Sequence, residues 1–308
     1  MEPKRIFVAG SLNIDLVIQM ERLARPGETL AGSDLILIPG GKGANQACAA
    51  AKLGGRTTMI GQVGSDAFAD PLLSSLRGAG VDTSGIGRAD CSTGAACISV
   101  LPNGENAIVI SPGANARVTP EFALSRLQEL RVGDIVLLQL EIPMATVQAV
   151  AAYARERGAI TILDPAPART LPAELLAQVS YLTPNESEAC VLLGHAAETR
   201  EVATQLRALG PASVILKLGS LGCFLGTETC FGPISGFVVD AVDTTAAGDT
   251  FNGAFAVALS EGLALADAAR FANAAAAISV TRLGAQSSIP DRAEAAAFLD
   301  KEAQAACS

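Results

Sequence analysis

The sequence predicts an α/β protein with a mostly parallel central sheet, helices on both of its faces, and a small second sheet beside it. Three observations favour this fold. Short β-rich runs alternate with helical stretches along most of the 308 residues. These runs are nearly continuous in apolar residues, as in strands that are buried on both faces. Two regions instead carry alternating apolar runs with no helix between them.

The main-sheet strands are expected where short apolar runs are bounded by turn residues. The candidate strands are residues 5–9, 57–62, 134–140, 159–163, 181–183 and 213–218. The candidate helices are residues 44–53, 67–79, 144–157, 186–193, 201–209, 246–260 and 265–281. A sheet of this kind binds ligands beyond the carboxyl ends of its strands, so polar residues there are the first candidates for a site.

The second sheet is expected from residues 16–39 and 95–110. The second of these regions contains Asn103-Gly104, a strong hairpin turn signal. Four strands without crossover helices would form a lid over the ligand edge of the main sheet. About residues 15–40 and 94–111 would contribute this lid, and residues 1–308 would form a single domain. The alternative is that they are extra antiparallel strands of the main sheet.

Composition excludes several classes of function. The formal net charge is -9, from 22 basic and 31 acidic residues without a basic block, so we expect no nucleic-acid partner. No run approaches the roughly 20 apolar residues of a membrane span, and the first residues resemble a strand more than a signal peptide, so we expect a cytoplasmic protein. The seven cysteines have no C-x-x-C spacing and there is one histidine, so no zinc site is readable. We expect most of the cysteines to fill small core positions.

The most informative segment is D-T-T-A-A-G-D-T-F-N-G at residues 243–253. Ala246, Ala247 and Gly248 are small enough for a phosphate to approach the backbone, and a helix beginning here adds a partial positive charge. Asp249 would lie at the helix start beside that phosphate, which suggests a kinase. The same helix dipole should favour its ionised form and weaken it as a base. The alternative is an Asp cap on a buried helix.

A second glycine-rich segment indicates a sugar site. Gly41, Lys42, Gly43 and Asn45 lie in G-G-K-G-A-N, where glycines admit a ligand to the backbone and the two polar side chains offer donors to hydroxyl oxygens. This spacing differs from a phosphate loop of the Walker type.

Polar residues near strand ends are further candidates for the sugar site. Asn13 and Asp15 are two apart, so on an extended segment both side chains would point the same way and could grip neighbouring hydroxyls. Glu141 follows an apolar strand at the expected ligand edge. Ordinary turn residues would explain these positions equally well.

Asn185 and Glu188 begin a predicted helix and lie on one of its faces. They could hold a hydrated Mg²⁺ that serves nucleotide phosphates, since magnesium keeps several waters and needs few protein ligands. Acids in a first helical turn are also favoured by the helix dipole alone.

These segments, in this order, resemble the ribokinase branch of the PfkB family of carbohydrate kinases from about Val8 to Pro290. The resemblance rests on G-S-L-N-I-D, P-G-G-K-G-A-N-Q-A, T-P-N-E-S-E, L-G-S-L-G and A-V-D-T-T-A-A-G-D-T-F-N-G-A-F. It implies a Rossmann-like three-layer domain with a β-lid that transfers the γ-phosphoryl group of ATP to O5 of ribose. Asp249 would accept the hydroxyl proton, and the amides of Ala247, Gly248 and Asp249 would form an anion hole.

The resemblance also implies the binding residues. The positions that match the sugar site are Asn13, Asp15, Gly41, Lys42, Asn45 and Glu141. The positions that match the nucleotide site are Asn185, Lys217, Gly219, Ser220, Gly222, Gly248 and Asn273, with Asn185 and Glu188 in the Mg²⁺ shell. The positions that match an activating K⁺ site are Asp243, Thr245, Ser279, Arg282, Gly284 and Ser288. Lys217 and Leu283 depart from the family, which commonly has a smaller polar residue and a basic residue there.

Several alternatives remain open at this stage. A deoxyribokinase, a pseudouridine or other nucleoside kinase, and a fructokinase all agree with these motifs. A sugar or nucleotide sensor without turnover is the alternative from another class, although a pure binder would have no reason to keep Asp249 and its loop. Apolar edge strands in the lid predict a homodimer.

Overall fold

The computed structural model describes residues 4–307 and the side chains of residues 4–304. The main sheet has nine strands in the order β13-β12-β11-β10-β9-β8-β1-β4-β5. The strands are β1 Ile6–Ala9, β4 Thr57–Val63, β5 Ile86–Arg88, β8 Ile135–Leu138, β9 Ile160–Leu163, β10 Tyr181–Leu182, β11 Ser213–Lys217, β12 Gly222–Gly226 and β13 Phe231–Ser235. All neighbours from β11 to β5 pair in parallel, whereas β12 and β13 form an antiparallel edge.

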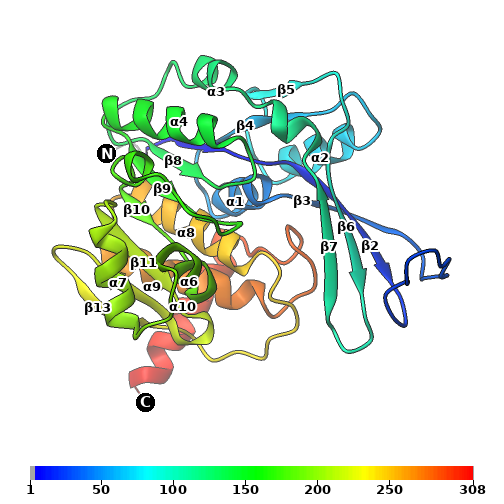
Figure 1. Cartoon of the computed structure of the whole chain (residues 1–308). Coiled ribbons are helices and arrows are strands. Elements are labelled where there is room, and N and C mark those ends of the chain that lie inside the picture. The colour runs from blue at the N-terminus through cyan, green and yellow to red at the C-terminus, as the bar shows by residue number, and fades with distance from the viewer. Residues whose placement is uncertain (1–3, 308) are drawn as a thin grey trace.

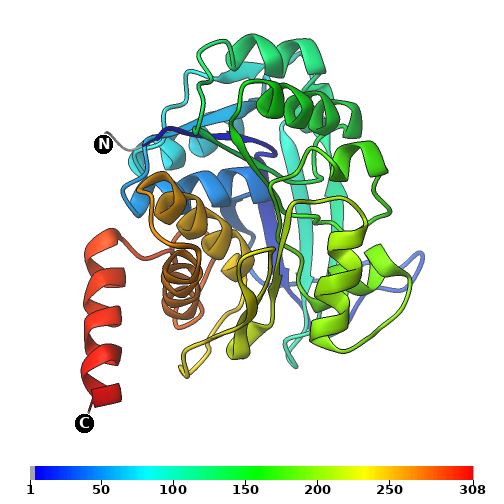
Figure 2. The same cartoon turned by 90° about the vertical axis from the view of Figure 1, so that its left-hand side faces the viewer.

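Helices cover both faces of the sheet, because its strands bury successive side chains on opposite sides. Along β1, Ile6 and Val8 join one core cluster while Phe7 and Ala9 join the other. The first face is covered by α1 Lys42–Lys52, α2 Ala69–Gly78, α8 Ala247–Ser260, α9 Leu265–Ser279 and α10 Arg292–Cys307. The second face is covered by α3 Pro120–Arg126, α4 Met144–Glu156, α5 Ala173–Leu176, α6 Glu186–Leu193 and α7 Thr199–Ala208. The expected three-layer α/β fold is confirmed (Figures 1 and 2).

The second sheet is separate from the first and has four strands in the order β3-β2-β6-β7. Its strands are β2 Asn13–Gln19, β3 Ile36–Gly40, β6 Gly94–Val100 and β7 Asn106–Ser111. The central strands β2 and β6 pair in parallel, and each pairs with an antiparallel outer strand. Asn103-Gly104 lies in the turn between β6 and β7, as expected. The sheet projects from the body of the molecule (Figure 1), so these strands are not extensions of the main sheet.

Several elements differ from the sequence-based expectation. The edge hairpin of β12 and β13, the short strand β5, and helices α3, α5 and α10 were not expected. The expectation that most cysteines fill the core is wrong: of the six cysteines described, only Cys48 and Cys223 are buried. Small size and apolarity permit burial but do not require it. Among residues 4–307, no helix is long and apolar enough to span a membrane.

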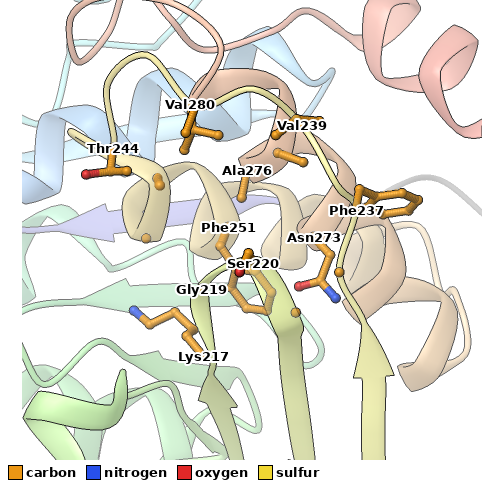
Figure 3. A pocket seen from close by; sticks show the side chains of 16 residues that line it. Lys217, Gly219, Ser220, Phe237, Val239, Thr244, Phe251, Asn273, Ala276 and Val280 are labelled. Atoms are coloured by element: carbon orange, nitrogen blue, oxygen red, sulfur yellow. The ribbon is translucent and has the colours of Figure 1, made fainter.

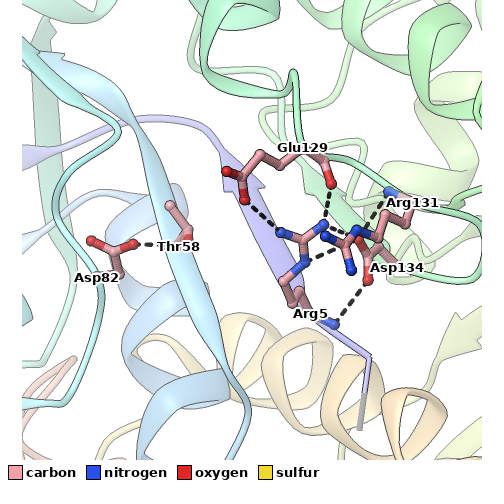
Figure 4. Close-up of polar contacts among 6 residues, drawn as sticks. All are labelled: Arg5, Thr58, Asp82, Glu129, Arg131 and Asp134. Atoms are coloured by element: carbon pink, nitrogen blue, oxygen red, sulfur yellow. Dashed lines mark hydrogen bonds and ion pairs between the residues drawn. The ribbon is translucent and has the colours of Figure 1, made fainter. Parts of the chain in front are cut away.

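A charged network fastens the amino ends of β1 and β8 (Figure 4). Asp134 accepts hydrogen bonds from the Arg5 guanidinium at 2.9 and 3.2 Å and from the Arg5 backbone N–H at 3.1 Å. Arg5 also forms an ion pair with Glu129 at 3.1 Å. This end of the sheet lies opposite the carboxyl ends of the strands, where ligands are expected to bind.

Candidate active site

Polar residues from distant parts of the chain meet where the parallel strands end. Glu141, Asp164 and Lys217 lie at or just beyond the carboxyl ends of β8, β9 and β11. The starts of α1 and α8 are at the same edge, since side chains at the start of α1 bond to Asp249 of α8.

Asp249 lies in the first turn of α8 and is 5% exposed. Asn45 donates its Nδ2–H to Oδ2 of Asp249, and Gln46 donates its Nε2–H to Oδ1, both at 3.0 Å. Two neighbouring residues of α1 therefore hold the carboxylate of α8 in one orientation. A carboxylate has about four acceptor sites, so accepting capacity remains for a substrate hydroxyl.

Burial raises the pKa of Asp249 to about 6, although Lys42 and the donors Asn45 and Gln46 favour its charged form and the nearby Asp164 carboxylate adds to the rise. The expectation that the helix start would weaken this base is therefore wrong. Removal from water outweighs the charge of Lys42 and the hydrogen bonds from Asn45 and Gln46. Asp249 combines an ionised state at neutral pH with a basicity well above that of an exposed aspartate.

Gln46 and Asp164 complete a network that the sequence reading missed. Gln46 donates its Nε2–H to Oδ2 of Asp164 at 3.0 Å as well as to Asp249. The other Asp164 oxygen, Oδ1, accepts from the ammonium of Lys217 at 3.0 Å. The available signal was position, because Asp164 directly follows an apolar strand just as Glu141 does, and Gln46 directly follows Asn45.

Asn13 and Asp15 lie two residues apart at the start of β2, as predicted. Oδ1 of Asn13 accepts from Nδ2 of Asn115 at 2.7 Å, and Asn115 is itself held by the backbone of Leu12. Burial and the nearby Glu141 carboxylate raise the pKa of Asp15 to about 6. The predicted sugar residues Asp15 and Glu141 are thus close enough to repel each other.

Glycines at the start of α1 let the helix approach the segment that follows β1 closely. Gly41 has φ 91°, and a methyl group on Gly43 would lie 2.5 Å from the backbone nitrogen of Ser11. The resulting contact allows Glu141 to accept from the Ser11 hydroxyl and from the Lys42 backbone N–H at 3.2 Å. Gly41, Lys42 and Gly43 therefore share the region of Glu141, as the sequence predicted.

Lys42 lies between the predicted sugar and nucleotide residues. Burial opposes its charge, but the carboxylates of Asp249, Asp164, Glu141 and Glu188 outweigh burial and raise the pKa of Lys42 above its usual value. One cation thus interacts with carboxylates from both sides of the site. This places the two predicted half-sites in one continuous region.

An apolar cavity of about 270 Å³ adjoins the start of α8 (Figure 3). Six of the seven predicted nucleotide residues line it, and only Asn185 does not: Lys217, Gly219, Ser220, Gly222, Gly248 and Asn273. Phe237, Val239 and Phe251 supply apolar surface that the sequence reading missed. A largely apolar cavity with a few polar groups suits a nucleobase.

The turn before α8 is strained where the predicted anion hole lies. Ala246 has φ 60°, the only positive φ of a non-glycine residue in the described chain. The N–H of Ala247 donates to the carbonyl of Thr244 at 3.2 Å, so this predicted anion-hole donor already has a partner within the turn. The N–H groups of Gly248 and Asp249 belong to the first helical turn, which has no intrahelical partner for them. Left-handed non-glycine residues cluster at functional sites.

Asn185 and Glu188 form a capping box at the start of α6. Oδ1 of Asn185 accepts from the Glu188 N–H and Oε2 of Glu188 accepts from the Asn185 N–H, both at 2.8 Å. Burial raises the pKa of Glu188, with Lys217 opposing and Asp164 adding to the rise. The capping box uses Oδ1 of Asn185 and both carboxylate oxygens of Glu188. These oxygens are of the type that a hydrated Mg²⁺ binds through its waters.

The predicted K⁺ residues lie in two loops that touch each other and at the end of α9, where Ser279 is the last residue. Asp243 accepts from the N–H of Thr245 and from the N–H of Gly284, both at 2.9 Å. These bonds outweigh burial and hold the pKa of Asp243 below its usual value. Ser279 and Ser288 are buried, while the Arg282 side chain turns to an ion pair with Glu294 at 2.6 Å. The carboxylate of Asp243 thus joins the two loops, and a carboxylate oxygen is a ligand type that suits a hard monovalent cation.

The fold, and the polar residues that meet around the buried Asp249 beside an apolar cavity, are those expected of a small-molecule kinase. The chain belongs to the PfkB family of carbohydrate kinases, because the model of the pfkB family carbohydrate kinases matches residues 3–292.

Named relatives agree with this family over nearly the whole chain. The ribokinase of Haemophilus influenzae is 41% identical over 302 residues, covering 96% of this chain and 99% of that protein. A ribokinase structure from Thermotoga maritima has 43% identity and a TM-score of 0.89, with 96% of this chain and 99% of that chain covered. The structure of Arabidopsis thaliana ribokinase complexed with ribose and ATP has 36% identity and a TM-score of 0.89, at the same coverage of both chains.

Proposed function

We propose that this protein is a ribokinase that transfers the γ-phosphoryl group of ATP to O5 of D-ribose. The observation that carries the proposal is the position of Asp249, buried between the predicted sugar residues and the apolar cavity with its pKa raised to about 6. Relatives named ribokinase, at 37–41% identity, support ribose as the substrate. The whole of residues 1–308 would act as one domain, with its second sheet as the lid.

The proposed mechanism needs positioning and charge stabilisation rather than a covalent intermediate. Asp15, Asn13 and Lys42 would bind the sugar hydroxyls and place O5 near Asp249. Asp249 would accept the hydroxyl proton as the new O–P bond forms. The amides at the start of α8 would stabilise the charge on the transferring group, because they are fixed before the reaction begins.

The nucleotide would lie with its base in the apolar cavity and its phosphates toward Gly248. Gly219, Ser220, Gly222 and Asn273 would line the base and ribose. Magnesium held through waters by Asn185 and Glu188 would neutralise part of the phosphate charge.

We also propose that K⁺ activates the enzyme through Asp243, Thr245, Ser279, Arg282, Gly284 and Ser288. An ion there would stabilise the two loops that flank the anion hole without touching substrate. We expect turnover with K⁺ to exceed turnover with Na⁺ or Tris alone at equal ionic strength. Equal rates in the three buffers would contradict this proposal.

A homodimer and a cytoplasmic location complete the proposal. The outer lid strands expose Ile36 and Leu37 on β3 and Ile108, Val109 and Ile110 on β7, which a second copy could cover. The cytoplasm supplies the proposed co-substrate ATP. Cell fractionation with detection of the native protein tests the location.

The function is tested by ADP release with ribose, 2-deoxyribose, fructose, pseudouridine and adenosine, with Mg²⁺ and K⁺ present. We expect the highest kcat/KM with ribose. A higher value with deoxyribose would instead favour the activity of the deoxyribokinase from Salmonella typhi, a relative at 35% identity. A nucleoside as the best substrate would overturn the sugar assignment. Ribose and ATP binding without ADP release from any substrate would indicate a sensor.

A further inference from the structure

The ammonium of Lys217 lies close to the N-terminal end of α8. Lys217 is the last residue of β11 and lines the apolar cavity (Figure 3). A methyl group placed on Gly248 would be 3.3 Å from its Nζ. The charge of Lys217 is therefore next to the amides that the proposed function assigns to the transferring phosphoryl group.

Asp164 forms an ion pair with this ammonium. Nζ of Lys217 and Oδ1 of Asp164 form an ion pair at 3.0 Å, with side chains 11% and 3% exposed. An ammonium has three N–H donors, and this bond uses one of them. The remaining donors are available to a ligand in the cavity that Lys217 lines.

Gln46 fixes the orientation of Asp164. Its Nε2 faces two carboxylates, Asp164 and Asp249, which when ionised can only accept hydrogen bonds, so the amide nitrogen must point toward them. Oε1 of Gln46 accepts from Nε2 of Gln139 at 2.6 Å. The ammonium, its carboxylate partner and the proposed base are thus connected through one amide group.

The surrounding charges explain why a cation is needed here. Asp249, Asp164 and Glu188 face this part of the site, and a γ-phosphoryl group approaching Asp249 would be repelled by them. Lys42 also interacts with Glu141 on the sugar side, whereas Lys217 lies on the nucleotide side. Both cations lie near Asp249 and Asp164, but of the two only Lys217 lines the cavity proposed for the nucleotide.

We propose that Lys217 is a catalytic residue that bonds to the transferring phosphoryl group, and that Asp164 is the positioning residue that presents its ammonium. This proposal rests on the proposed function. The competing explanation is that the pair is only a buried structural ion pair. The two explanations differ in what happens when both charges are removed together, because removing one partner of a buried pair leaves an unpaired charge while removing both does not.

The test compares Lys217→Met, Asp164→Asn and the double variant in the full-length protein. For each, we would measure the Tm, kcat with ribose, and the Kd of ADP and of a non-hydrolysable ATP analogue, with Mg²⁺ present. Asp134→Asn is the matched control, because it breaks the buried ion pair with Arg5 at 2.9 Å at the opposite end of the sheet.

We expect Lys217→Met to lower kcat on the order of 10²-fold, as does loss of one preorganised donor to transition-state charge. The analogue should lose about tenfold more affinity than ADP, because only the analogue carries a γ-phosphoryl group. The double variant should recover the Tm lost in Asp164→Asn, yet keep the low kcat of Lys217→Met. Asp134→Asn should lower the Tm and leave kcat and the ratio of the two Kd values unchanged.

Two outcomes would overturn the proposal: recovery of wild-type kcat in the double variant, or equal loss of ADP and analogue affinity in Lys217→Met. Failure of the proposed function is distinct from either, because it would appear as absence of ribose-dependent turnover in the wild-type protein. The comparison of ADP with the analogue decides the role of Lys217 even then, since it needs no sugar.

Discussion

Burial and local charge act in opposite directions on the carboxylate of Asp249. Hydrogen bonds from Asn45 and Gln46 and the charge of Lys42 favour ionisation, yet burial wins and raises its pKa to about 6. A proton acceptor works best when its pKa is near the working pH and it is still ionised. Asp249 meets both conditions at neutral pH, which an exposed aspartate at the same helix start would not.

Replacing Asp249 by Asn should abolish proton acceptance while keeping the shape of the site. Because Asn45 and Gln46 donate to both oxygens of Asp249, the new amide would lose one of these bonds, but the sugar should still bind. We expect kcat to fall about 10²–10⁴-fold, or on the order of 3–5 kcal/mol, with a small change in the Kd of ribose. Steady-state kinetics and calorimetric titration measure the two quantities. A variant that keeps most of its turnover would rule out Asp249 as the base.

The pH dependence should report two carboxylates rather than one. The pKa values of Asp15 and Asp249 are both raised to about 6, and both groups act in their ionised form. As the pH falls through 6 each gains a proton, so kcat/KM for ribose should begin to decline near pH 6 and approach a limiting slope of about 100-fold per pH unit well below it. In Asp15→Asn the decline should be about tenfold per unit, because one titrating group remains. The measurement is kcat/KM for ribose from pH 5 to pH 7, about one unit either side of these pKa values. A value that does not change over this range would contradict both assignments.

At the scale of elements, the contact between α1 and α8 sets the geometry of the base. Gly253 on α8 lies against α1, where an added methyl group would be 2.5 Å from Cβ of Ala49 and 2.8 Å from the carbonyl oxygen of Gln46. Asn45 and Gln46, which orient Asp249, come from this same part of α1. The distance between the two helices therefore decides whether the donors reach the carboxylate.

Gly253→Ala should force these helices apart. We expect a loss of about 1–3 kcal/mol of folding free energy from overpacking, together with a fall in kcat because Asn45 and Gln46 move relative to Asp249. Thermal or denaturant unfolding and steady-state kinetics measure the two effects. The control is Gly78→Ala in α2, where an added methyl group meets nothing within 4 Å. That change should stabilise the protein by about 0.4–1 kcal/mol and leave kcat unchanged. Equal effects of the two substitutions would contradict the role of the contact.

At the scale of the whole molecule, the lid is an open sheet with two apolar outer strands. Val109 on β7 is 71% exposed, the most of the large apolar side chains on the lid. Pairing with a second copy would cover this surface and hold the lid over the sugar residues that β2 supplies. Assembly and substrate enclosure would then depend on the same strands.

Val109→Asp should therefore convert the proposed dimer to a monomer at micromolar concentration, because a charge would be buried at the interface. Val132→Asp is the matched control, since Val132 is 72% exposed but lies in the loop before β8. Sedimentation velocity on the wild type and both variants measures the assembly. A wild-type monomer would remove the dimer proposal, and equal dissociation of both variants would place the interface elsewhere.

Most of the fold followed from local patterns. Alternating apolar runs, the Asn103-Gly104 turn and the periodic helices led to the parallel sheet and the separate lid, because each depends on neighbouring residues. The antiparallel hairpin of β12 and β13 was missed, although every residue of β12 is buried; only the edge strand β13 lacks a continuous buried pattern. The exposed position of Cys97 on β6 was also unforeseen, because its exposure depends on which face of the lid is covered.

By itself, the sequence determined the family, the order of the elements and most of the residues proposed for the site. The tertiary structure decided how they combine. Gln46 lies 118 positions from Asp164 and 203 from Asp249, and Lys217 lies 53 positions from Asp164, yet hydrogen bonds join all four. It also decided the basicity of Asp249, because a pKa depends on removal from water and on charges brought near by folding. Neither quantity is a property of residues adjacent in the chain.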